Sequence, residues 1–351
     1  MHWKIKAKIQ NTIAMLPSEL SYATYYWIQR HVGGLRKINP VGVLTGAIET
    51  CQLICKQDRS LQDKVFLEVG TGRMVIVPIA YWLMGARKIY TIDLNPYLKS
   101  ELVEESLKYI FNNQEEVRNL FDSLLVEERF EKLSEVFNNS SRFSMQEILE
   151  LCCIDYTAPG DARSTQLPDK VVDFHTSYTV FEHIPKEILQ KILVEGCRII
   201  KNNGLFVHKI DYSDHFAHSD HHISAINFLQ YSDKQWDEYA ENQYMYMNRM
   251  RHDDFVCLYK SSGHCIIKTQ TNIDKSLQVL LTNKNFKLNG LSDLLSQWDQ
   301  YDMLKGAKLK SIEFGKSFEG VVVGISNQGA LKVLTENGTK ELYSSKNIEY
   351  I

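Results

Sequence analysis

Apolar and polar positions follow two different periods in the central part of the chain. Apolar runs typical of buried strands occur at residues 65–70 (VFLEVG) and 88–94 (KIYTIDL). The segment between them, through Met84, has the apolar density of a buried helix. This order predicts a βαβ unit, and therefore an α/β fold with a mostly parallel sheet.

The same alternation returns further along the chain. Strands are predicted at residues 171–181 (VVDFHTSYTVF) and 205–211 (LFVHKID). An amphipathic helix is predicted at 186–200, ended by Asn202-Asn203-Gly204. Residues 253–271 predict a helix, a glycine turn and one more strand.

The remaining segments predict additions to this sheet. Residues 1–62 read as helices with aromatic residues three and four apart, and residues 97–150 are helical but too long for one crossover helix. Residues 215–250 are polar, aromatic and rich in histidine, which suggests a lid with short helices. Beyond residue 290, short strands separated by turn signals predict a small all-β barrel.

Composition narrows the classes of protein. The formal net charge of −3 and the pI near 6.4 give no reason to expect a nucleic-acid partner. The seven cysteines are scattered without paired C-x-x-C units, so we expect no structural zinc site and reduced thiols. No signal peptide and no run of ~18 apolar residues occurs, which predicts a cytoplasmic protein that does not cross a membrane.

Gly70 and Gly72 lie where the first strand passes to its helix. Glycine permits a positive φ and close approach of a ligand, and the helix start offers free N–H donors. Nicotinamide, flavin and adenosyl cofactors all use such a turn. The absence of Gly-Lys-Ser/Thr excludes a Walker loop, and Val75 stands where a dinucleotide fold has its third glycine.

Two carboxylates accompany this loop. Glu68 lies two residues before Gly70, and Asp93 ends the second strand about 20 residues further on. They could simply cap strand ends. Together they favour a ligand with a cationic, zwitterionic end and an unphosphorylated ribose, because a carboxylate in the place of Asp93 can accept both ribose hydroxyls.

Four segments in this order, over roughly residues 60–275, resemble the motifs of class I S-adenosylmethionine-dependent methyltransferases. They are LEVGTGR (67–73), TIDLNP (91–96), PGDARSTQLPDKVVDFHTSYTVFEHIP (159–185) and RIIKNNGLFVHKID (198–211). The sequence departs from the family at Met74, where many members carry a third glycine.

The resemblance implies S-adenosylmethionine as cofactor and a set of residues that bind it. Asp93 is the implied ribose-binding acid, and Asp161 with Ala162 would meet the adenine ring, although Pro-Gly-Asp-Ala is also an ordinary turn. Ser177 and Tyr178 fall at the carboxyl end of a strand, where open α/β sheets bind ligands. The full cofactor set is Glu68, Gly70, Thr71, Gly72, Asp93, Leu94, Asp161, Ala162 and Ser177.

Candidates for proton transfer follow the strand at 205–211. The stretch HKIDYSDHFAHSDHH (208–222) holds five histidines and three aspartates. Histidine is the natural base near neutral pH, so His208 and His215 are the candidate bases, and Asp211, four residues before His215, could orient its ring. The alternative is a solvated polar loop, which we favour for the part after His218.

A metal-assisted variant is weighed against this. Some metal-dependent ribose O-methyltransferases carry Glu-x-x-Glu-His at the helix start after the fourth strand. Here Glu182-His183 keeps the final pair, but Thr179 replaces the first glutamate. We therefore assign no metal ligands, since a complete site needs more than this pair.

Aromatic residues suggest a substrate pocket. The predicted substrate contacts are Tyr178, Tyr212, Trp236, Tyr244 and Arg249, with Tyr231, Tyr239 and Tyr246 nearby in the lid. An aromatic stripe can equally be core. The segment YSDHF and the later Y-x-N-R-x-R-H resemble methyltransferases of bacterial surface-sugar and natural-product pathways, which implies a sugar or secondary-metabolite hydroxyl as acceptor.

The C-terminal segment resembles the small SH3-like barrel that ends biotin protein ligases. The shared features are Trp298-Asp299, Gly320 to Ile325, and Gln328-Gly329-Ala330-Leu331. The ligase's catalytic domain has no counterpart in residues 1–290, so biotinylation is not implied. The barrel could pack on the substrate pocket, mediate homodimerisation, or dock a carrier or another partner.

These inferences combine into one expectation. The fold is a Rossmann-like, doubly wound, mostly parallel sheet, with a helical cap (1–62), a methyltransferase domain (63–290, lid 212–252) and an SH3-like barrel (291–351). The expected activity is methyl transfer from S-adenosylmethionine to a hydroxyl of a small metabolite or sugar. The alternatives are an N-methyltransferase acting on a secondary metabolite or peptide, and a non-catalytic sensor of S-adenosylmethionine.

Overall fold

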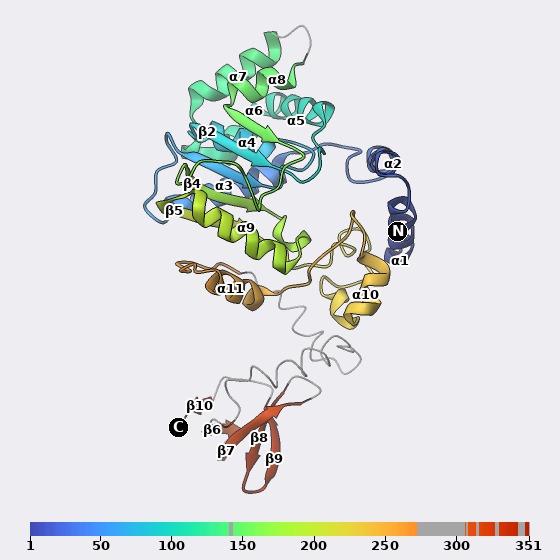
Figure 1. Cartoon of the computed structure of the whole chain (residues 1–351), viewed down its shortest axis with the longest axis vertical. Coiled ribbons are helices and arrows are strands. Elements are labelled where there is room, and N and C mark those ends of the chain that lie inside the picture. Colours follow the sequence, from blue (N-terminus) through green and yellow to red (C-terminus); the bar gives the residue numbers. More distant parts are fainter. Residues whose placement is uncertain are drawn as a thin grey trace. The chain divides into compact units, whose positions relative to one another are not determined.

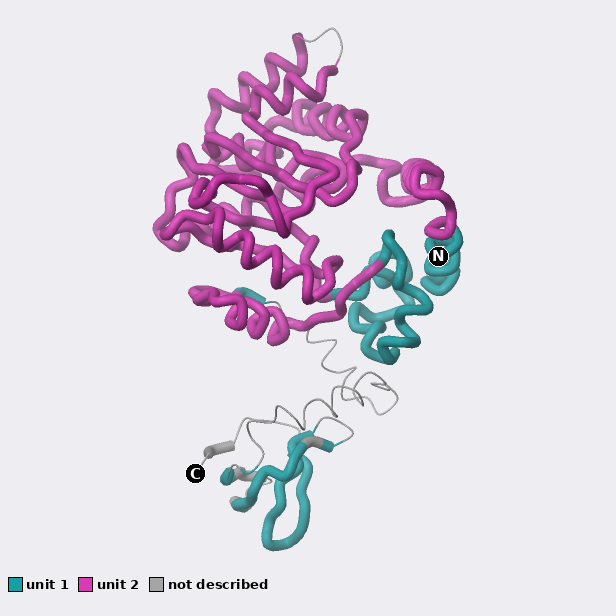
Figure 2. Tube along the Cα trace, viewed as in Figure 1, with its two compact units in different colours: residues 1–12, 213–245, 270–351 teal, residues 13–212, 246–269 magenta. Residues whose placement is uncertain are grey.

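The structure is a computed structural model that separates into two compact units. It describes residues 1–139, 143–271, 306, 308–313, 316–326, 330–342 and 348–350. Unit 1 comprises Met1–Thr12, Ser213–Met245 and Gln270–Ile351, and unit 2 comprises Ile13–Tyr212 and Tyr246–Thr269 (Figure 2). These units divide the chain differently from the predicted domains, which stay predictions.

Unit 2 is built on a parallel sheet. Its strands are β1 (Val65–Val69), β2 (Lys88–Ile92), β3 (Ile154–Thr157), β4 (Val172–Tyr178) and β5 (Ile200–Lys209). They lie in the order β3-β2-β1-β4-β5, and every neighbouring pair is parallel (Figure 1). The strand order reverses between β1 and β4, which makes this the switch point where such sheets bind ligands. The predicted Rossmann-like α/β class is confirmed.

Helices precede and connect these strands. They are α1 (Trp3–Ala14), α2 (Ser18–His31), α3 (Val41–Cys55), α4 (Ile76–Leu83), α5 (Ser100–Asn112), α6 (Gln114–Phe121), η1 (Asp122–Leu124), α7 (Glu127–Asn139), α8 (Met145–Leu151), η2 (Phe181–His183), α9 (Lys186–Ile199) and α11 (His252–Ser261). The helix between the first two strands and the extra helices before β3 are thereby confirmed.

Helices cover both faces of the sheet. Neighbouring residues on a strand point to opposite faces, so each contacts a different apolar layer. Phe66 of β1 belongs to a core cluster with residues of α3 and α4. The next residue, Leu67, belongs to a second cluster with residues of α9 and α11. Two apolar layers therefore enclose the strands and leave their carboxyl ends to carry polar groups.

Two expected elements differ from the structure. Helix α9 ends at Ile199 and the chain enters β5 at once, so Asn202-Asn203-Gly204 lies inside the strand rather than after the helix. Ile200 pairs with Val172 of β4, and the register then shifts between Val172 and Phe174. Residues 264–271, predicted to hold a strand, form none.

Unit 1 contains part of the predicted lid. Two short helices, η3 (Asn227–Gln230) and α10 (Asp233–Ala240), pack with the start of α1 around Trp3, Phe216 and Trp236. Nowhere in the described residues is there a helix with the length and apolar character needed to cross a membrane.

The C-terminal segment forms a small antiparallel sheet. Its strands are β6 (Lys308–Glu313), β7 (Lys316–Ile325), β8 (Leu331–Thr335), β9 (Gly338–Leu342) and β10 (Ile348–Tyr350), in the order β10-β6-β7-β8-β9. The predicted change from βα units to consecutive strands is confirmed. Trp298-Asp299 and Gln328-Gly329, which carried part of the resemblance, lie outside the described residues.

Candidate functional site

The glycine turn after β1 has the left-handed backbone that its sequence predicts. Gly70 has φ 90° and Gly72 has φ 66°. A Cβ at Gly70 would lie 2.4 Å from a methyl carbon of Val180, whereas a Cβ at Gly72 would meet no atom within 4 Å. Gly70 is thus required by both backbone and packing, while Gly72 leaves open space beside the loop.

Asp93 joins the end of β2 to this loop. Its Oδ2 accepts a hydrogen bond from the Gly72 N–H at 2.8 Å, and its Oδ1 accepts one from the Asn95 N–H at 3.0 Å. Burial raises the pKa of Asp93, and the surrounding backbone N–H groups oppose that rise. An ionised carboxylate has about four acceptor positions, so these two bonds leave capacity for a ligand's hydroxyls.

Glu68 lies beneath the loop rather than on its open side. Its side chain is buried, and its Oε2 accepts a hydrogen bond from the Thr91 hydroxyl at 2.6 Å. Because that hydroxyl donates to Glu68, the Thr71 hydroxyl, also 2.6 Å away, donates to Thr91. Burial raises the pKa of Glu68 to about 8. Glu68 therefore supports Thr71, and its predicted contact with a ligand stays a prediction.

The residues after β3 reach the same edge of the sheet. The Gly160 N–H donates to the Asp93 carbonyl oxygen at 2.8 Å. The Asp161 carboxylate is held by the Arg163 guanidinium, with nitrogen–oxygen distances from 2.6 to 2.9 Å, which lowers its pKa. Ala162 is buried in the sheet's core and Leu94 is exposed. The bond from Gly160 to Asp93 thus places the next residue, Asp161, near the end of β2. The carboxylate of Asp161 is already paired with Arg163.

The end of β4 supplies two predicted residues with different surroundings. Ser177 is buried, and its hydroxyl has no hydrogen-bond partner among the described residues. The Tyr178 hydroxyl donates to the Gly42 carbonyl oxygen at 3.2 Å, and its ring fills the space where Gly46 lacks a side chain. Tyr178 therefore packs β4 against α3, and Ser177 keeps an unused polar group.

His208 lies inside unit 2, bonded at both ring nitrogens. Its Nε2 lies 2.9 Å from Nδ1 of His175, and its Nδ1 bonds the hydroxyl of Tyr259. The Phe181 ring centre is 4.3 Å away. Burial, with the neighbouring His175 and His264, lowers the pKa of His208. This surrounding is that of a structural histidine, and a role as base stays a prediction.

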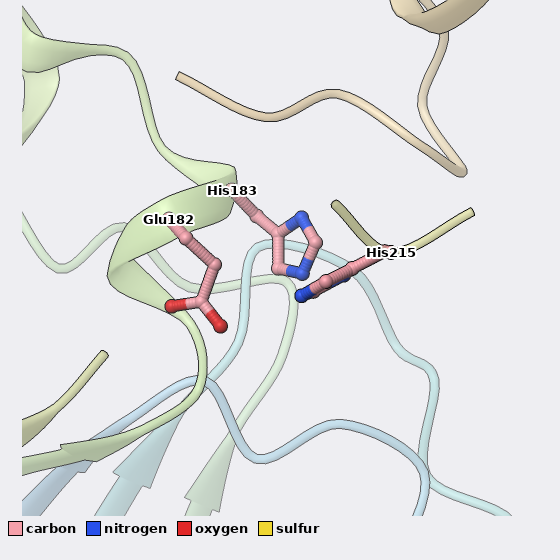
Figure 3. A group of neighbouring side chains, drawn as sticks. All are labelled: Glu182, His183 and His215. Atoms are coloured by element: carbon pink, nitrogen blue, oxygen red, sulfur yellow. The ribbon is translucent and has the colours of Figure 1, made fainter. Parts of the chain in front are cut away.

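The short helix η2 carries Glu182 and His183, shown as sticks in Figure 3. His183 Nδ1 lies 2.8 Å from the Tyr246 carbonyl oxygen, so this nitrogen is the protonated one. Burial raises the pKa of Glu182 to about 8. The Asn248 side-chain amide donates to the carbonyl oxygens of Phe181 and Ile184, both at 2.8 Å, and so secures η2. His215, labelled in the same figure, belongs to unit 1.

Within unit 1, His215 stacks on His218 with ring centres 4.8 Å apart. The preceding Asp214 is buried and anchors the loop. Its Oδ1 accepts from the Phe216 N–H at 2.8 Å, and its Oδ2 accepts from the Asn227 amide at 2.9 Å. Asp214 is therefore a structural carboxylate.

The predicted substrate contacts are dispersed. Trp236 is buried in the aromatic core of unit 1 and Tyr244 is half-buried there, whereas Tyr212 and Arg249 belong to unit 2. Tyr212 packs against Phe255, and burial raises its pKa to about 12. Asp211 follows β5 and acts electrostatically on Glu182. The placement of Trp236 is that of a core residue, and its contact with a substrate stays a prediction.

Sequence reasoning missed several polar residues of this edge. Thr91 connects Glu68 to Thr71, and Asn95 bonds Asp93 through its N–H. Arg73 lies against tyrosine rings directly after the glycine loop. Each of the three stands inside a quoted motif, LEVGTGR or TIDLNP, so proximity to the glycines was the available signal.

Many open parallel sheets bind nucleotide cofactors at a glycine loop beside the switch point, with an acid at the end of the neighbouring strand. Methyltransferases are among the solved structures that the chain resembles. A protein of Methanococcus maripaludis described as an S-adenosyl-L-methionine-dependent methyltransferase is 13% identical, with a TM-score of 0.35 and coverage of 69% of this chain and 83% of that chain.

Two further structures show the same kind of likeness. A protein of Nostoc punctiforme described as an O-methyltransferase is 12% identical, with a TM-score of 0.36 and coverage of 64% of this chain and 53% of that chain. Haemonchus contortus phosphoethanolamine N-methyltransferase 2, in complex with phosphomonomethylethanolamine and S-adenosylhomocysteine, is 12% identical, with a TM-score of 0.39 and coverage of 82% and 54%. This chain thus spans about half the length of these two proteins. At these identities and TM-scores, its activity has to be inferred from its own residues.

The C-terminal segment has a match of its own. Residues 311–346 match the family described as the biotin protein ligase C terminal domain. No curated protein sequence matches the chain significantly.

Proposed function

We propose that the chain transfers a methyl group from S-adenosylmethionine to a hydroxyl of a small metabolite or sugar. The observation that carries this proposal is the position of Asp93 at the end of β2. It holds the left-handed glycine loop through the Gly72 N–H and keeps acceptor capacity beside that loop, which follows β1 next to the switch point of the sheet. An acid in this place suits a ribose whose hydroxyls are free.

The remaining groups of this edge fit the same cofactor, which when bound supplies a methyl group on a sulfonium. Gly72 leaves open space beside the loop, and the buried Ser177 hydroxyl has no partner among the described residues. Glu68 and Thr71 hold the loop from beneath. Binding and orientation are thus the chief tasks of these residues, because methyl transfer requires the nucleophile in line with the sulfonium.

We assign the proton-accepting role to His215 in preference to His208. His208 is committed to His175 and Tyr259 inside unit 2. The assignment of His215 follows from its place in the histidine-rich segment after β5, where it is half-buried. A hydroxyl acceptor needs a base, and a neutral amine needs less assistance. Transfer to an amine and binding without transfer remain the alternatives, and the experiments below separate them.

Homodimerisation or carrier docking by the C-terminal sheet is proposed on the family match alone.

The cofactor assignment is tested by calorimetry with S-adenosylhomocysteine. We expect the intact protein to bind on the order of micromolar, and Asp93→Ala to weaken binding at least about tenfold, or ~1.4 kcal/mol. Asp155→Ala is the matched control, because this acid on β3 pairs with Lys88 outside the site. Absence of binding by the unaltered protein would overturn the proposed cofactor.

The base assignment is tested by transfer of a labelled methyl group to a panel of small hydroxyl and amine acceptors. We expect His215→Ala to keep its affinity for S-adenosylhomocysteine and to lose most of its transfer to hydroxyls. Unchanged transfer would remove His215 as base. Preference for amines would establish N-methylation, and binding with no transfer to any acceptor would favour a sensor.

A further inference from the structure

Arg73 directly follows the glycine loop and lies against three tyrosine rings. Its guanidinium carbon is 5.7 Å from the ring centre of Tyr25 and 5.9 Å from those of Tyr26 and Tyr97. All four residues belong to unit 2. Contacts at these distances are favourable cation–π interactions, and three of them hold one guanidinium in place.

Helix α2 fixes this arrangement. Side chains four residues apart along α2 each bond the segment after β2 or helix α5: Tyr22 to Asn95 (3.1 Å), Tyr26 to Glu101 (2.6 Å) and Arg30 to Glu105 (2.6 Å). Tyr22 also packs edge-on against Tyr97, with ring centres 5.3 Å apart. Helix α2 is thus bonded at three successive turns, and two of the rings around Arg73 are fixed by these contacts: Tyr26 by its bond to Glu101 and Tyr97 by packing against Tyr22.

The donors of Arg73 have no acceptor among the residues that the structure describes. In the part of the chain that the structure describes, its side chain forms no hydrogen bond and no ion pair. A guanidinium has five N–H donors in a planar fork that matches a carboxylate or a phosphate. Next to it, the space beside Gly72 is open. A positioned cation with unused donors therefore borders the proposed cofactor site.

We propose that Arg73 binds an anionic group, a carboxylate or a phosphate, of a ligand held at the glycine loop. This inference rests on the proposed function for the ligand's place. Two sources share the chemistry: the carboxylate at the methionine end of the cofactor, and an acidic group on the methyl acceptor. In either case the tyrosine contacts pre-orient the fork, which reduces the entropy lost on binding.

Calorimetry on the full chain separates these sources. S-adenosylhomocysteine carries the amino-acid carboxylate, and 5′-methylthioadenosine lacks it. If Arg73 binds the cofactor, Arg73→Gln weakens S-adenosylhomocysteine at least about tenfold and leaves methylthioadenosine unchanged. Arg73→Lys keeps the charge but not the fork, so it gives an intermediate loss. Arg118→Gln, at a guanidinium already paired with Glu127, is the matched control.

If Arg73 binds the acceptor, both nucleosides bind Arg73→Gln as well as the unaltered protein. Inorganic phosphate titrated into the protein saturated with S-adenosylhomocysteine then binds, and Arg73→Gln abolishes that binding. The proposal is overturned if Arg73→Gln and Arg73→Lys bind S-adenosylhomocysteine, methylthioadenosine and phosphate with the same affinities as the unaltered protein. Failure of the proposed function is distinct, because the unaltered protein then binds neither nucleoside, while phosphate titrated alone still reports on Arg73.

Discussion

The two loop glycines differ in what an added methyl group would meet. Gly72→Ala places a Cβ in open space, so its structural cost is that of an alanine at positive φ, about 1–2 kcal/mol. We expect this variant to stay folded and to lose S-adenosylhomocysteine affinity at least about tenfold, because the methyl group occupies the space beside the loop. Calorimetry checks this, and unchanged affinity would mean that no ligand uses that space.

Gly70→Ala should destabilise the protein more than Gly72→Ala does, because the added methyl group also clashes with a neighbour. Its Cβ would lie 2.4 Å from Val180, which adds a clash to the strained backbone. We expect a larger fall in the unfolding temperature than for Gly72→Ala. Adding Val180→Ala to Gly70→Ala should recover the part of the lost unfolding temperature that the clash causes. The part that the positive φ of an alanine causes should remain. Thermal unfolding of the single and double variants measures both, and no recovery would place the whole cost in the backbone.

Glu68 gives the protein a pH dependence of predictable sign. Burial raises its pKa from the ordinary 4.5 to about 8, so the folded state holds a proton that the unfolded state releases. Its contribution to stability is complete below pH 4.5 and is lost as the pH rises through 8. Glu68→Gln keeps an acceptor for Thr91 and cannot ionise. We therefore expect its unfolding temperature to fall less between pH 5 and pH 8.5 than that of the unaltered protein.

Glu195 is the matched contrast in the same unit. The Arg198 guanidinium, with Thr165, lowers the pKa of Glu195 to about 2. Its contribution is present above pH 4.5 and is lost as the pH falls toward 2. Glu195→Gln should therefore lower the unfolding temperature at pH 7. It should also reduce the change of unfolding temperature with pH, but only below pH 4.5. Equal pH profiles for the Glu68 and Glu195 variants would contradict both assignments.

At the scale of elements, a partly buried chain of polar side chains connects β4, β5 and α11. His175 bonds His208, and His208 bonds Tyr259. Tyr259→Phe keeps the ring and removes the hydroxyl, so the half-buried His208 loses one hydrogen bond at a cost of about 1 kcal/mol. Denaturant unfolding measures this loss. Tyr109→Phe, whose hydroxyl is exposed, should leave stability unchanged.

The order of elements could be predicted from the sequence because its signals are local. Apolar runs bounded by glycine gave β1 and β2, and the amphipathic period gave α9. The end of α9 was placed wrongly because Asn202-Asn203-Gly204 looks like a helix stop. In the structure, pairing of Ile200 with Val172 draws this stretch into β5, where Asn202 and Asn203 are exposed. Strand pairing is a long-range term that a local pattern does not contain.

The contacts of the candidate site could be predicted where a sequence motif alone determines the backbone geometry. The contact of Asp93 with the Gly72 N–H follows from a loop and a strand end that any parallel βαβ unit brings together. The bonding of His208 to His175 and Tyr259 was not predictable, because three elements far apart in sequence create it. The same holds for Arg73, whose tyrosine neighbours come from α2 and from the segment after β2.

At the scale of the whole molecule, unit 1 joins the first residues of the chain to residues 213–245, which are part of the predicted lid. Trp3 is the centre of this junction. The centre of its ring lies 5.2 Å from that of Phe216 and 4.9 Å from that of Tyr239, and the backbone N–H of Trp3 donates to the Asp220 carboxylate at 2.8 Å. Residues of the predicted helical cap therefore share one apolar core with residues 213–245, which no local pattern indicates.

This junction predicts that the order of the lid depends on the N-terminal residues. Trp3 is only 3% exposed, so Trp3→Ala removes its ring contacts at a cost of about 3–5 kcal/mol. Unit 1 has a small core, so we expect faster hydrogen exchange in residues 213–245 with unchanged exchange in β1 and β4. Trp27→Ala is the control, because that ring is 58% exposed and stacks on His31. Exchange that rises equally in the sheet and the lid would show that the two units unfold together.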